Sequence, residues 1–477
     1  MRVLFSYLPV NAEGYFCVSQ QRFSKIKKTP ELIFPILPAS ALTILRRDGH
    51  EVFFLDAILR RLGRERFINE VILTKPDLLV FETKTPVIKD NWEVVDLVKE
   101  KCPVLKIAAV GDHVSVLPEE TLLNSAVDYV VTGGDYDAVL PGLCSFIADP
   151  GKNAVPAGVY YRKGAEIINS GSPEFVKDLD TLPFIDREII PWHDYREGWR
   201  LKERFFYISA SRGCVYKCTF CSWAQMLYGG TFRQRSVDNV MKELRYLKEK
   251  YAPEEIFFDD DTFTANRRWT EEFCRRLINE APGFIWSCNG RVDNVDAGLL
   301  RLMKESGCRM IKFGIESANP DTLLRIRKGY TVDDVRKAFA AAKLAGLMTH
   351  GTVMFGYPWE TKRDMLRTVR FVKGLCPDQV QFSFVIAYPG TQLYKEALRN
   401  SWLRFRDGEW EKLDMSVPSL VNPHLGDKEL KRLYRHAWMS FYLSPRFAAG
   451  KILGIRSPEE LWYFARNAWT VLRGHIG

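Results

Sequence analysis

The sequence predicts an α/β protein with two parallel-sheet units followed by a helical extension. Apolar, β-branched segments alternate with helical patterns in residues 1–150, and the alternation returns in residues 201–400. This pattern ends near Asn400. Because strands that alternate with helices form parallel sheets covered on both faces, each unit is expected to be such a sheet.

The first unit, residues 1–150, is expected to be a Rossmann-like domain with right-handed crossovers. Helical patterns separate its strands at Pro38–Arg47, Glu65–Thr74 and Asn91–Lys101. Gly49 is placed to end the first helix in a left-handed conformation. Ligands of such sheets bind beyond the carboxyl ends of the strands, so the loops there are the expected site. The expected strands are Val3–Tyr7, Val52–Ala57, Asp77–Phe81, Leu105–Val110 and Val127–Val131.

Residues 151–200 are expected to link the units, and residues 201–400 to form an open, partial (β/α)6 barrel. Ala157–Gly171 alternates apolar and polar residues around a Lys-Gly pair, which predicts a β-hairpin in the linker. Chemistry in such barrels lies at the carboxyl ends of the strands. The expected barrel strands are Phe205–Ile208, Glu255–Phe258, Phe284–Ser287, Met310–Phe313, Thr352–Phe355 and Val380–Phe384, with helices at Val237–Lys250, Arg267–Ala281, Ala297–Ser306, Val332–Ala345 and Lys362–Gly374.

Residues 401–477 are expected to form a helical cap. Helical patterns occur at Lys428–Tyr442 and Pro458–Arg473, and Ser457 with Glu460 has the spacing of a capping box at the start of the second. That second helix carries a stripe of leucine and aromatic residues. The stripe is expected to pack against the rest of the protein, with binding at a membrane surface as the alternative.

The composition is that of a globular protein in a reducing compartment. The 477 residues are 46% hydrophobic and 27% charged, which excludes a disordered or fibrous chain. No apolar stretch is long enough to span a membrane, and the N-terminal segment is expected to be a buried strand rather than a signal peptide. The net charge of +9 is spread along the chain, so nucleic-acid binding is not expected. The 10 cysteines are expected to remain reduced in the cytoplasm.

The strongest chemical signal is the C-x3-C-x2-C loop formed by Cys214, Cys218 and Cys221. Thiolates are ligands for zinc or iron–sulfur clusters. Structural zinc takes four ligands, and no fourth cysteine or histidine lies nearby in the sequence. Three ligands from one loop favour a 4Fe-4S cluster with one open iron, and a zinc site completed by a distant cysteine is the alternative.

This loop, with Phe220 before its third cysteine, resembles the signature of radical S-adenosylmethionine (SAM) enzymes. Within that family, the chain is similar over nearly its whole length to the subgroup that carries an N-terminal cobalamin-binding domain. In the barrel the similar segments are IFFDDDTFTANRRW, CNGRVDNVD, GIESANPDTLLRIRKGYT and MFGYPWET. In the first unit they are GHEVFFLDA, VGDHVSVLPEE and VDYVVTGGDYDAVL.

The resemblance implies two cofactors in the barrel, a 4Fe-4S cluster held by the three cysteines and SAM bound at its open iron. It implies that Phe220 lies beside the adenine of SAM, and that Asp260 and Asp261 lie where the family contacts the methionine amino group. Further SAM-binding residues are expected where barrel strands end, at Glu316, Ser317 and Arg291. For Glu316 a structural ion pair is the alternative. For Arg291, a structural salt bridge is an equally weighted alternative. For Asp259–Asp261, the equally weighted alternative is that they cap the N-terminus of a helix.

The resemblance also implies cobalamin in the first unit, at the loops after its fourth and fifth strands. The expected contacts are Gly111, His113, Gly133 and Gly134. The chain departs from the family here, with Val-Gly-Asp-His in place of Gly-Gly-Pro-His and Gly-Gly-Asp-Tyr in place of Gly-Glu-Gly-Glu. It also lacks the D-x-H-x-x-G pattern that donates a histidine to cobalt in other cobalamin proteins. No protein histidine is therefore expected to coordinate the metal.

The implied activity is reductive cleavage of SAM to a 5′-deoxyadenosyl radical, followed by methylation of an unactivated carbon. A radical cyclisation, rearrangement or oxidation without methyl transfer is the first alternative, and a non-catalytic corrinoid- or cluster-binding protein is the second. The expected partners are a small-molecule or lipid-like substrate and an electron donor such as flavodoxin or ferredoxin. Cytoplasmic localisation is expected, with peripheral membrane association as an alternative. The sequence names no catalytic residue and no particular substrate.

Overall fold

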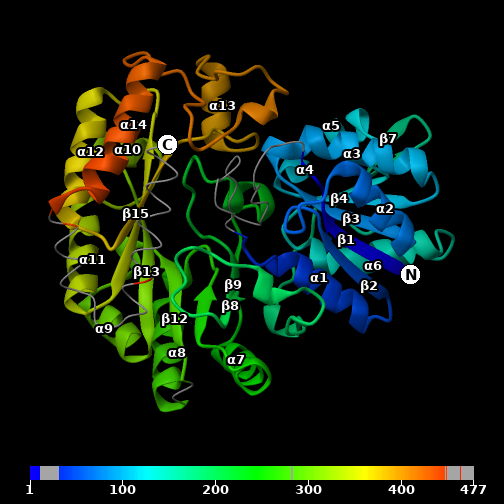
Figure 1. Ribbon diagram of the computed structural model, residues 1–477, viewed down its shortest axis with the longest axis horizontal. Coiled ribbons are helices and arrows are strands. Elements are labelled where there is room, and N and C mark those ends of the chain that lie inside the picture. Colours follow the sequence, from blue (N-terminus) through cyan, green and yellow to red (C-terminus); the bar gives the residue numbers. More distant parts are fainter. Residues whose placement is uncertain (11–31, 281–282, 446, 448–461, 463–477) are drawn as a thin grey trace.

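The first unit is a sheet covered by helices on both faces (Figure 1). The computed structural model describes residues 1–10, 32–280, 283–445, 447 and 462. Five parallel strands lie in the order β2-β1-β3-β4-β5, each close to its predicted position. These strands are β1 (Arg2–Tyr7), β2 (Glu51–Asp56), β3 (Leu78–Thr83), β4 (Lys106–Gly111) and β5 (Tyr129–Val131). The helices are α1 (Ile36–Arg47), α2 (Arg64–Thr74), α3 (Ile88–Lys101), α4 (Asp112–Val116), α5 (Pro118–Asn124) and α6 (Tyr136–Ala148).

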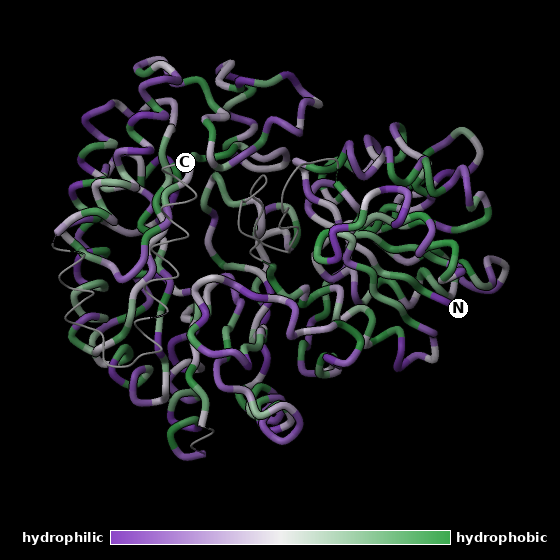
Figure 2. The backbone as a smooth tube through the Cα atoms, in the orientation of Figure 1, coloured by the Kyte–Doolittle hydropathy of each residue, from purple (hydrophilic) through white to green (hydrophobic). Residues whose placement is uncertain are grey.

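Successive side chains of the first strand enter different hydrophobic cores, as the pleat of a strand requires. Val3 and Phe5 pack with α1 and α6, whereas Leu4 packs with α2 and α3. Both faces of the strands are therefore buried, which explains their nearly continuous apolar sequence. Figure 2 shows these hydrophobic strands inside more polar helices. Gly49 follows α1 at a φ of 86°, as predicted for its terminus.

The predicted hairpin in the linker belongs to the first sheet. Strands β6 (Val159–Lys163) and β7 (Glu166–Asn169) extend the sheet beyond β5 with antiparallel pairing. Val131 pairs with Val159 and Tyr129 with Tyr161. The sheet therefore continues to Asn169, past the boundary at residue 150 that the sequence suggested.

The second unit is an open sheet of six parallel strands in the order β15-β14-β13-β12-β11-β8, so β8 and β15 are its edges. This arrangement confirms the predicted partial barrel. The strands are β8 (Phe205–Ile208), β11 (Glu255–Phe258), β12 (Ile285–Gly290), β13 (Cys308–Glu316), β14 (Met348–Phe355) and β15 (Gln379–Phe384). The helices are α7 (Val237–Tyr251), α8 (Arg267–Glu280), α9 (Ala297–Glu305), α10 (Pro320–Arg325), α11 (Val332–Leu344), α12 (Lys362–Leu375) and α13 (Gln392–Arg399).

The segment after residue 400 contacts both units. Helix α14 (Asp427–Tyr442) packs against α12 and β15, close to its predicted position. The short helix η7 (Trp410–Lys412) reaches the first unit, where the Trp410 indole Nε1 donates a hydrogen bond of 2.9 Å to Glu120. The helix predicted at Pro458–Arg473 lies outside the described residues. Within the described part of the chain, no helix combines the length and apolar character needed to cross a bilayer.

Candidate functional site

The three-cysteine loop extends from a small antiparallel hairpin at the carboxyl end of β8. Strand β9 (Ser211–Gly213) pairs with β10 (Phe232–Gln234), and the cysteines lie between them. We call residues 211–234 the cluster hairpin. Gly213 adopts a φ of 82°, and a Cβ there would lie 2.1 Å from the Thr231 carbonyl oxygen. Only glycine therefore permits the close approach that begins the loop.

Hydrogen bonds from distant segments fix the backbone of this loop. The Gln225 side chain donates to the carbonyl oxygens of Cys218 and Cys221, at 2.6 and 3.0 Å. The backbone N–H of Thr219 donates to Ile326 at the end of α10, and its carbonyl accepts from Leu393 in α13. The loop is thus held in position before any cofactor binds.

The surroundings of the thiols suit a metal cluster. Cys218 is buried, and Cys214 and Cys221 are partly buried. Burial raises the pKa of Cys214, and it raises the pKa of Cys221 to about 12. These thiols would ionise only when bound to a cation such as iron. Among the described residues, no three His, Cys, Asp or Glu side chains are grouped to hold a single metal ion.

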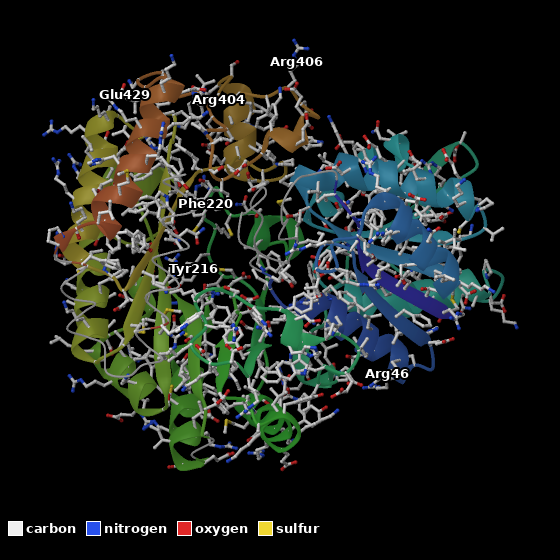
Figure 3. All side chains as sticks on the ribbon, in the orientation of Figure 1. Arg46, Tyr216, Phe220, Arg404, Arg406 and Glu429 are labelled. Carbon is white, nitrogen blue, oxygen red and sulfur yellow. The ribbon has the colours of Figure 1, made fainter. Side chains whose placement is uncertain are left out.

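Charged and aromatic side chains gather beside the loop, and they include three of the predicted SAM-binding residues. The Arg291 guanidinium lies 3.4 Å from the centre of the Tyr216 ring and donates to the Lys328 carbonyl oxygen at 2.6 Å. The Lys328 ammonium donates to Glu316 at 2.7 Å and lies 5.5 Å from the Phe220 ring. Figure 3 shows Tyr216 and Phe220 near each other within the second unit.

Backbone irregularity directs Glu316 into this group. Its φ is 60°, and the pairing of β13 with β14 shifts register between Gly314 and Glu316. Such conformations are unfavourable for a glutamate and are typical of functional sites. Burial alone would lower the pKa of Lys328, but the carboxylate of Glu316 raises it well above its ordinary value. Glu316 therefore forms the ion pair that was the alternative to a SAM contact, and its partner Lys328 is the residue that the sequence did not identify.

The three aspartates after β11 have different surroundings. The Asp260 carboxylate accepts hydrogen bonds from the Ala210 N–H, at 3.1 Å, and from the Ser211 hydroxyl. It therefore anchors the cluster hairpin, and burial raises its pKa to about 6. Burial and the neighbouring carboxylates of Asp259 and Asp260 raise the pKa of Asp261 well above its usual range. Asp261 Oδ2 is buried without a hydrogen-bond partner, so this side chain is the better placed of the two for a cationic ligand.

Ser317, which directly follows β13, directs its side chain into the protein interior. Its hydroxyl donates to Glu360 at 3.0 Å and lies 3.4 Å from the Thr368 hydroxyl. Ser317 is fully buried, and burial raises the pKa of Glu360 to about 8. The structure thus places Ser317 in an internal polar network rather than beside Phe220. A SAM contact through its side chain stays a prediction.

The predicted cobalamin residues lie at the carboxyl edge of the first sheet. Side chains from other segments of the protein pack against two of them. A Cβ on Gly134 would lie 2.4 Å from the Tyr228 ring, and a Cβ on Gly133 would lie 2.9 Å from Pro173. These glycines therefore allow the linker and the cluster hairpin to approach the backbone. Gly111 has a φ of 119°, and its close neighbour is the backbone of Thr83.

His113 is fully buried beside aromatic rings. Its Nε2 lies 3.3 Å from a Glu120 carboxylate oxygen, and its ring contacts Trp92 and Trp410 edge-on. This imidazole is held by groups of the first unit and of η7. A contact between His113 and cobalamin stays a prediction.

Buried polar groups at the same sheet edge are unsatisfied by the protein. The hydroxyls of Thr83, Thr85 and Tyr136 are buried without hydrogen-bond partners. Lys84 is also fully buried, 3.1 Å from Glu82 and 5.6 Å from the Trp223 ring of the cluster hairpin. Unsatisfied buried donors and acceptors are costly unless a ligand or water completes them. The edge therefore fits a ligand that carries many amide groups, as the corrin ring does.

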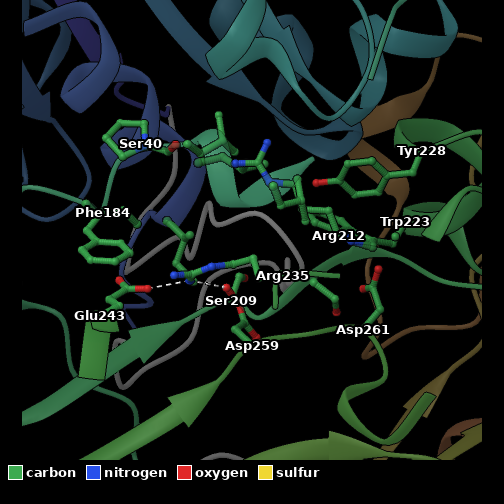
Figure 4. Close-up of a pocket in the computed structure, with 18 residues that line it drawn as sticks. Ser40, Phe184, Ser209, Arg212, Trp223, Tyr228, Arg235, Glu243, Asp259 and Asp261 are labelled. Carbon is green, nitrogen blue, oxygen red and sulfur yellow. Dashed lines mark hydrogen bonds and ion pairs between the residues drawn. The ribbon is translucent and has the colours of Figure 1, made fainter. Parts of the chain in front are cut away.

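A pocket lies between the cluster hairpin, α1, the linker and the carboxyl ends of β8 and β11 (Figure 4). Asp259 and Asp261 line it at the carboxyl end of β11, and Arg212 and Tyr228 of the cluster hairpin lie across from them. Its outer wall is apolar and comes from α1 and the linker. The apolar residues are Ile36, Leu37, Leu179, Leu182, Pro183, Phe184 and Ile185.

Comparison with known proteins agrees with this geometry. Residues 208–372 match the radical SAM superfamily, and residues 33–140 match the B12 binding domain. "Uncharacterized methyltransferase PH0819" of Pyrococcus horikoshii is 28% identical over 89% of this chain and 91% of its own length. The anaerobic magnesium-protoporphyrin IX monomethyl ester cyclase of Rubrivivax gelatinosus is 24% identical over 74% of this chain and 64% of its own.

Solved structures share the fold across both units. The radical SAM methyltransferase TsrM of Kitasatospora setae, with cobalamin and a [4Fe-4S] cluster bound, matches 99% of this chain and 98% of its own with a TM-score of 0.72 and 17% identity. The cobalamin-dependent SAM radical enzyme OxsB matches 100% of this chain and 71% of its own, with a TM-score of 0.72 and 15% identity.

The protein is a radical SAM enzyme with a B12 binding domain. Its radical SAM and B12 binding domains imply a 4Fe-4S cluster, SAM and cobalamin as cofactors.

Proposed function

We propose that this enzyme uses its cluster and cobalamin together to methylate an unactivated carbon of a small-molecule substrate. One observation carries the proposal: the three-cysteine loop and the unsatisfied edge of the B12 binding domain face each other. The loop continues into the helix η4 (Trp223–Leu227), which packs against α4, and Lys84 of the edge lies 5.6 Å from the Trp223 ring. Both cofactors would therefore share one reaction space.

When bound, the cluster would supply the electron that cleaves one SAM to methionine and a 5′-deoxyadenosyl radical, and cobalamin would carry a methyl group from a second SAM, which leaves as S-adenosylhomocysteine. The chain's residues bind and orient these groups and exclude water. Cys214, Cys218 and Cys221 would hold three irons. Phe220 and the Lys328–Glu316 pair lie together beside the cysteine loop, and they would contact SAM at the open iron. Asp261 would pair with the ammonium group of SAM.

A second candidate is radical chemistry without methyl transfer. The relative from Rubrivivax gelatinosus is a cyclase by name, and its similarity covers 74% of this chain. The names of the relatives from Pyrococcus horikoshii and Kitasatospora setae, both methyltransferases, support the first candidate. The reductant is proposed to be a flavodoxin or ferredoxin, and the reaction to take place in the cytoplasm.

The test is anaerobic reconstitution with iron, sulfide and hydroxocobalamin, followed by incubation with methyl-labelled SAM, a reductant and a small-molecule extract. Methyl transfer by this route predicts label in a new product, with 5′-deoxyadenosine and S-adenosylhomocysteine both formed. 5′-Deoxyadenosine without S-adenosylhomocysteine would favour the second candidate. A preparation that retains no corrinoid would refute the proposed use of cobalamin.

The variant with Cys214, Cys218 and Cys221 all replaced by alanine should bind no cluster iron and form neither nucleoside product. The matched control replaces Cys102 and Cys376, two partly buried free cysteines outside the loop. Full iron and sulfide content in the loop variant would refute the assignment of the cluster ligands.

A further inference from the structure

Four buried charges join the B12 binding domain to the cluster hairpin. Asp135 and Asp137 follow β5 in the first unit, and Arg212 and Arg233 face each other across the β9–β10 pair. We call these four residues the interdomain charge network. Its side chains are at most 11% exposed, and its two positive and two negative charges balance.

The geometry of the network is specific. Arg212 donates to both carboxylate oxygens of Asp137, at 2.9 and 2.6 Å, and to Asp135 at 3.1 Å. Arg233 donates to Asp135 at 3.2 Å through Nη2, with a second short contact through Nη1, and to the Val176 carbonyl oxygen at 2.8 Å. Burial alone would raise the pKa of Asp135, but Arg212 and Arg233 lower it below its ordinary value.

Neighbouring contacts tie the same loop to three other segments. Ser40 of α1 donates to Asp137 at 2.6 Å, and the Val176 N–H of the linker donates to Asp135 at 2.8 Å. The Gly134 N–H donates to the Leu227 carbonyl oxygen of the cluster hairpin at 2.8 Å. The loop after β5 is therefore held from the linker, from α1 and from the barrel.

The position of Arg212 gives this network a role in the reaction geometry. Arg212 lies in a paired strand two residues before Cys214, and its partners directly follow the predicted corrin contacts Gly133 and Gly134. A bidentate arginine–carboxylate pair fixes orientation as well as distance. One side chain thus connects the segment that holds the cluster to the segment at the cobalamin edge.

We propose that Arg212 is a positioning residue that sets the distance and orientation between the cluster and cobalamin. The inference rests on the proposed function and adds a positioning residue to it. Loss of the bidentate pair should leave both cofactors bound but displaced relative to each other. A displacement of about 1 Å can lower a rate about 100-fold when reactants must be aligned.

The experiment compares the holoenzyme with Arg212→Lys and Asp137→Asn, which alter the pair from opposite units. The control is Arg309→Lys, because Arg309 makes a comparable buried pair with Glu255, at 2.7 Å, inside the barrel. Iron and corrinoid contents are measured first. The two readouts are the magnetic coupling between reduced cluster and cob(II)alamin, seen by electron paramagnetic resonance, and the ratio of S-adenosylhomocysteine to 5′-deoxyadenosine.

Both network variants are expected to keep their cofactors, to show altered coupling, and to lower the product ratio about 10- to 100-fold. The control should retain the wild-type coupling and ratio. Wild-type coupling in both network variants, or altered coupling in the control, would overturn the proposal. Corrinoid loss from Asp137→Asn with an intact cluster would overturn it in favour of a cofactor-retaining role. If Arg212→Lys loses iron, the proposal is judged from the coupling and product ratio of Asp137→Asn, whose substitution lies outside the cluster hairpin. A wild-type enzyme without corrinoid would instead refute the proposed function.

Discussion

Glu360 should make the stability of this protein depend on pH, and replacing it with glutamine should remove that dependence. Its side chain is 1% exposed and accepts hydrogen bonds from Ser317, at 3.0 Å, and from Thr322, at 3.3 Å. Its second oxygen has no hydrogen-bond partner. Burial raises its pKa to about 8 from an ordinary value of 4.5.

Because the pKa is raised in the folded chain, folding favours the protonated form. The stabilising contribution is complete below the unfolded pKa, and it is lost as the pH rises through the folded pKa of about 8. Between pH 6 and pH 9 the wild type should lose about 3 kcal/mol, since each pKa unit corresponds to about 1.4 kcal/mol. Glutamine has the shape of the neutral acid, accepts the same two hydrogen bonds and does not titrate.

The assay is thermal unfolding of wild type and Glu360→Gln between pH 6 and pH 9. The variant's advantage in Tm should grow with pH by about 6–12 °C, taking about 2–4 °C per kcal/mol for a unit of barrel size. Glu119→Gln, at an exposed glutamate, is the matched control and should show no such growth. An advantage for Glu360→Gln that stays constant with pH would refute the buried-acid interpretation.

The cluster hairpin and the edge of the first unit should each respond to single substitutions. Asp260→Asn should retain iron and lower 5′-deoxyadenosine formation about tenfold, because a weaker anchor loosens the hairpin; undiminished formation would contradict this. Gly134→Ala should destabilise the protein by about 1–3 kcal/mol through its clash with Tyr228. Adding Tyr228→Leu should recover part of the lost Tm, and no recovery would exclude the clash. Cob(II)alamin should show no nitrogen hyperfine splitting, in wild type or in His113→Ala; a splitting lost in the variant would show a histidine ligand.

The strands were predictable because their signal is local. Runs of apolar, β-branched residues mark each strand of both parallel sheets within a few residues. The pairing of β5 with β6 was not predictable, since it joins Tyr129 to Tyr161 across a helix and a linker. No local pattern indicates that a hairpin will continue a sheet rather than lie in a linker.

The site was predictable only in part, for a related reason. The cysteine spacing identifies the cluster ligands, and strand ends indicate where Glu316 and Arg291 lie. The partner of each charge depends on register and on contacts between distant segments. Asp260 and Asp261 are adjacent, yet one anchors the hairpin and the other has a free oxygen. Similarly, position 134 requires glycine because the ring of Tyr228, which comes from the other unit, leaves no room for a Cβ.

The contact between Trp410 and Glu120 has a consequence for biosynthesis. The two residues are separated by 290 positions, so a ribosome has almost completed the barrel before Trp410 exists. At about 5–20 residues per second, this delay is about 15–60 s. During that interval the nascent first unit lacks the indole that packs against His113, and its aromatic wall at Trp92 faces solvent or a chaperone. The aromatic wall of the B12 binding domain is therefore completed only after all six barrel strands have been synthesised.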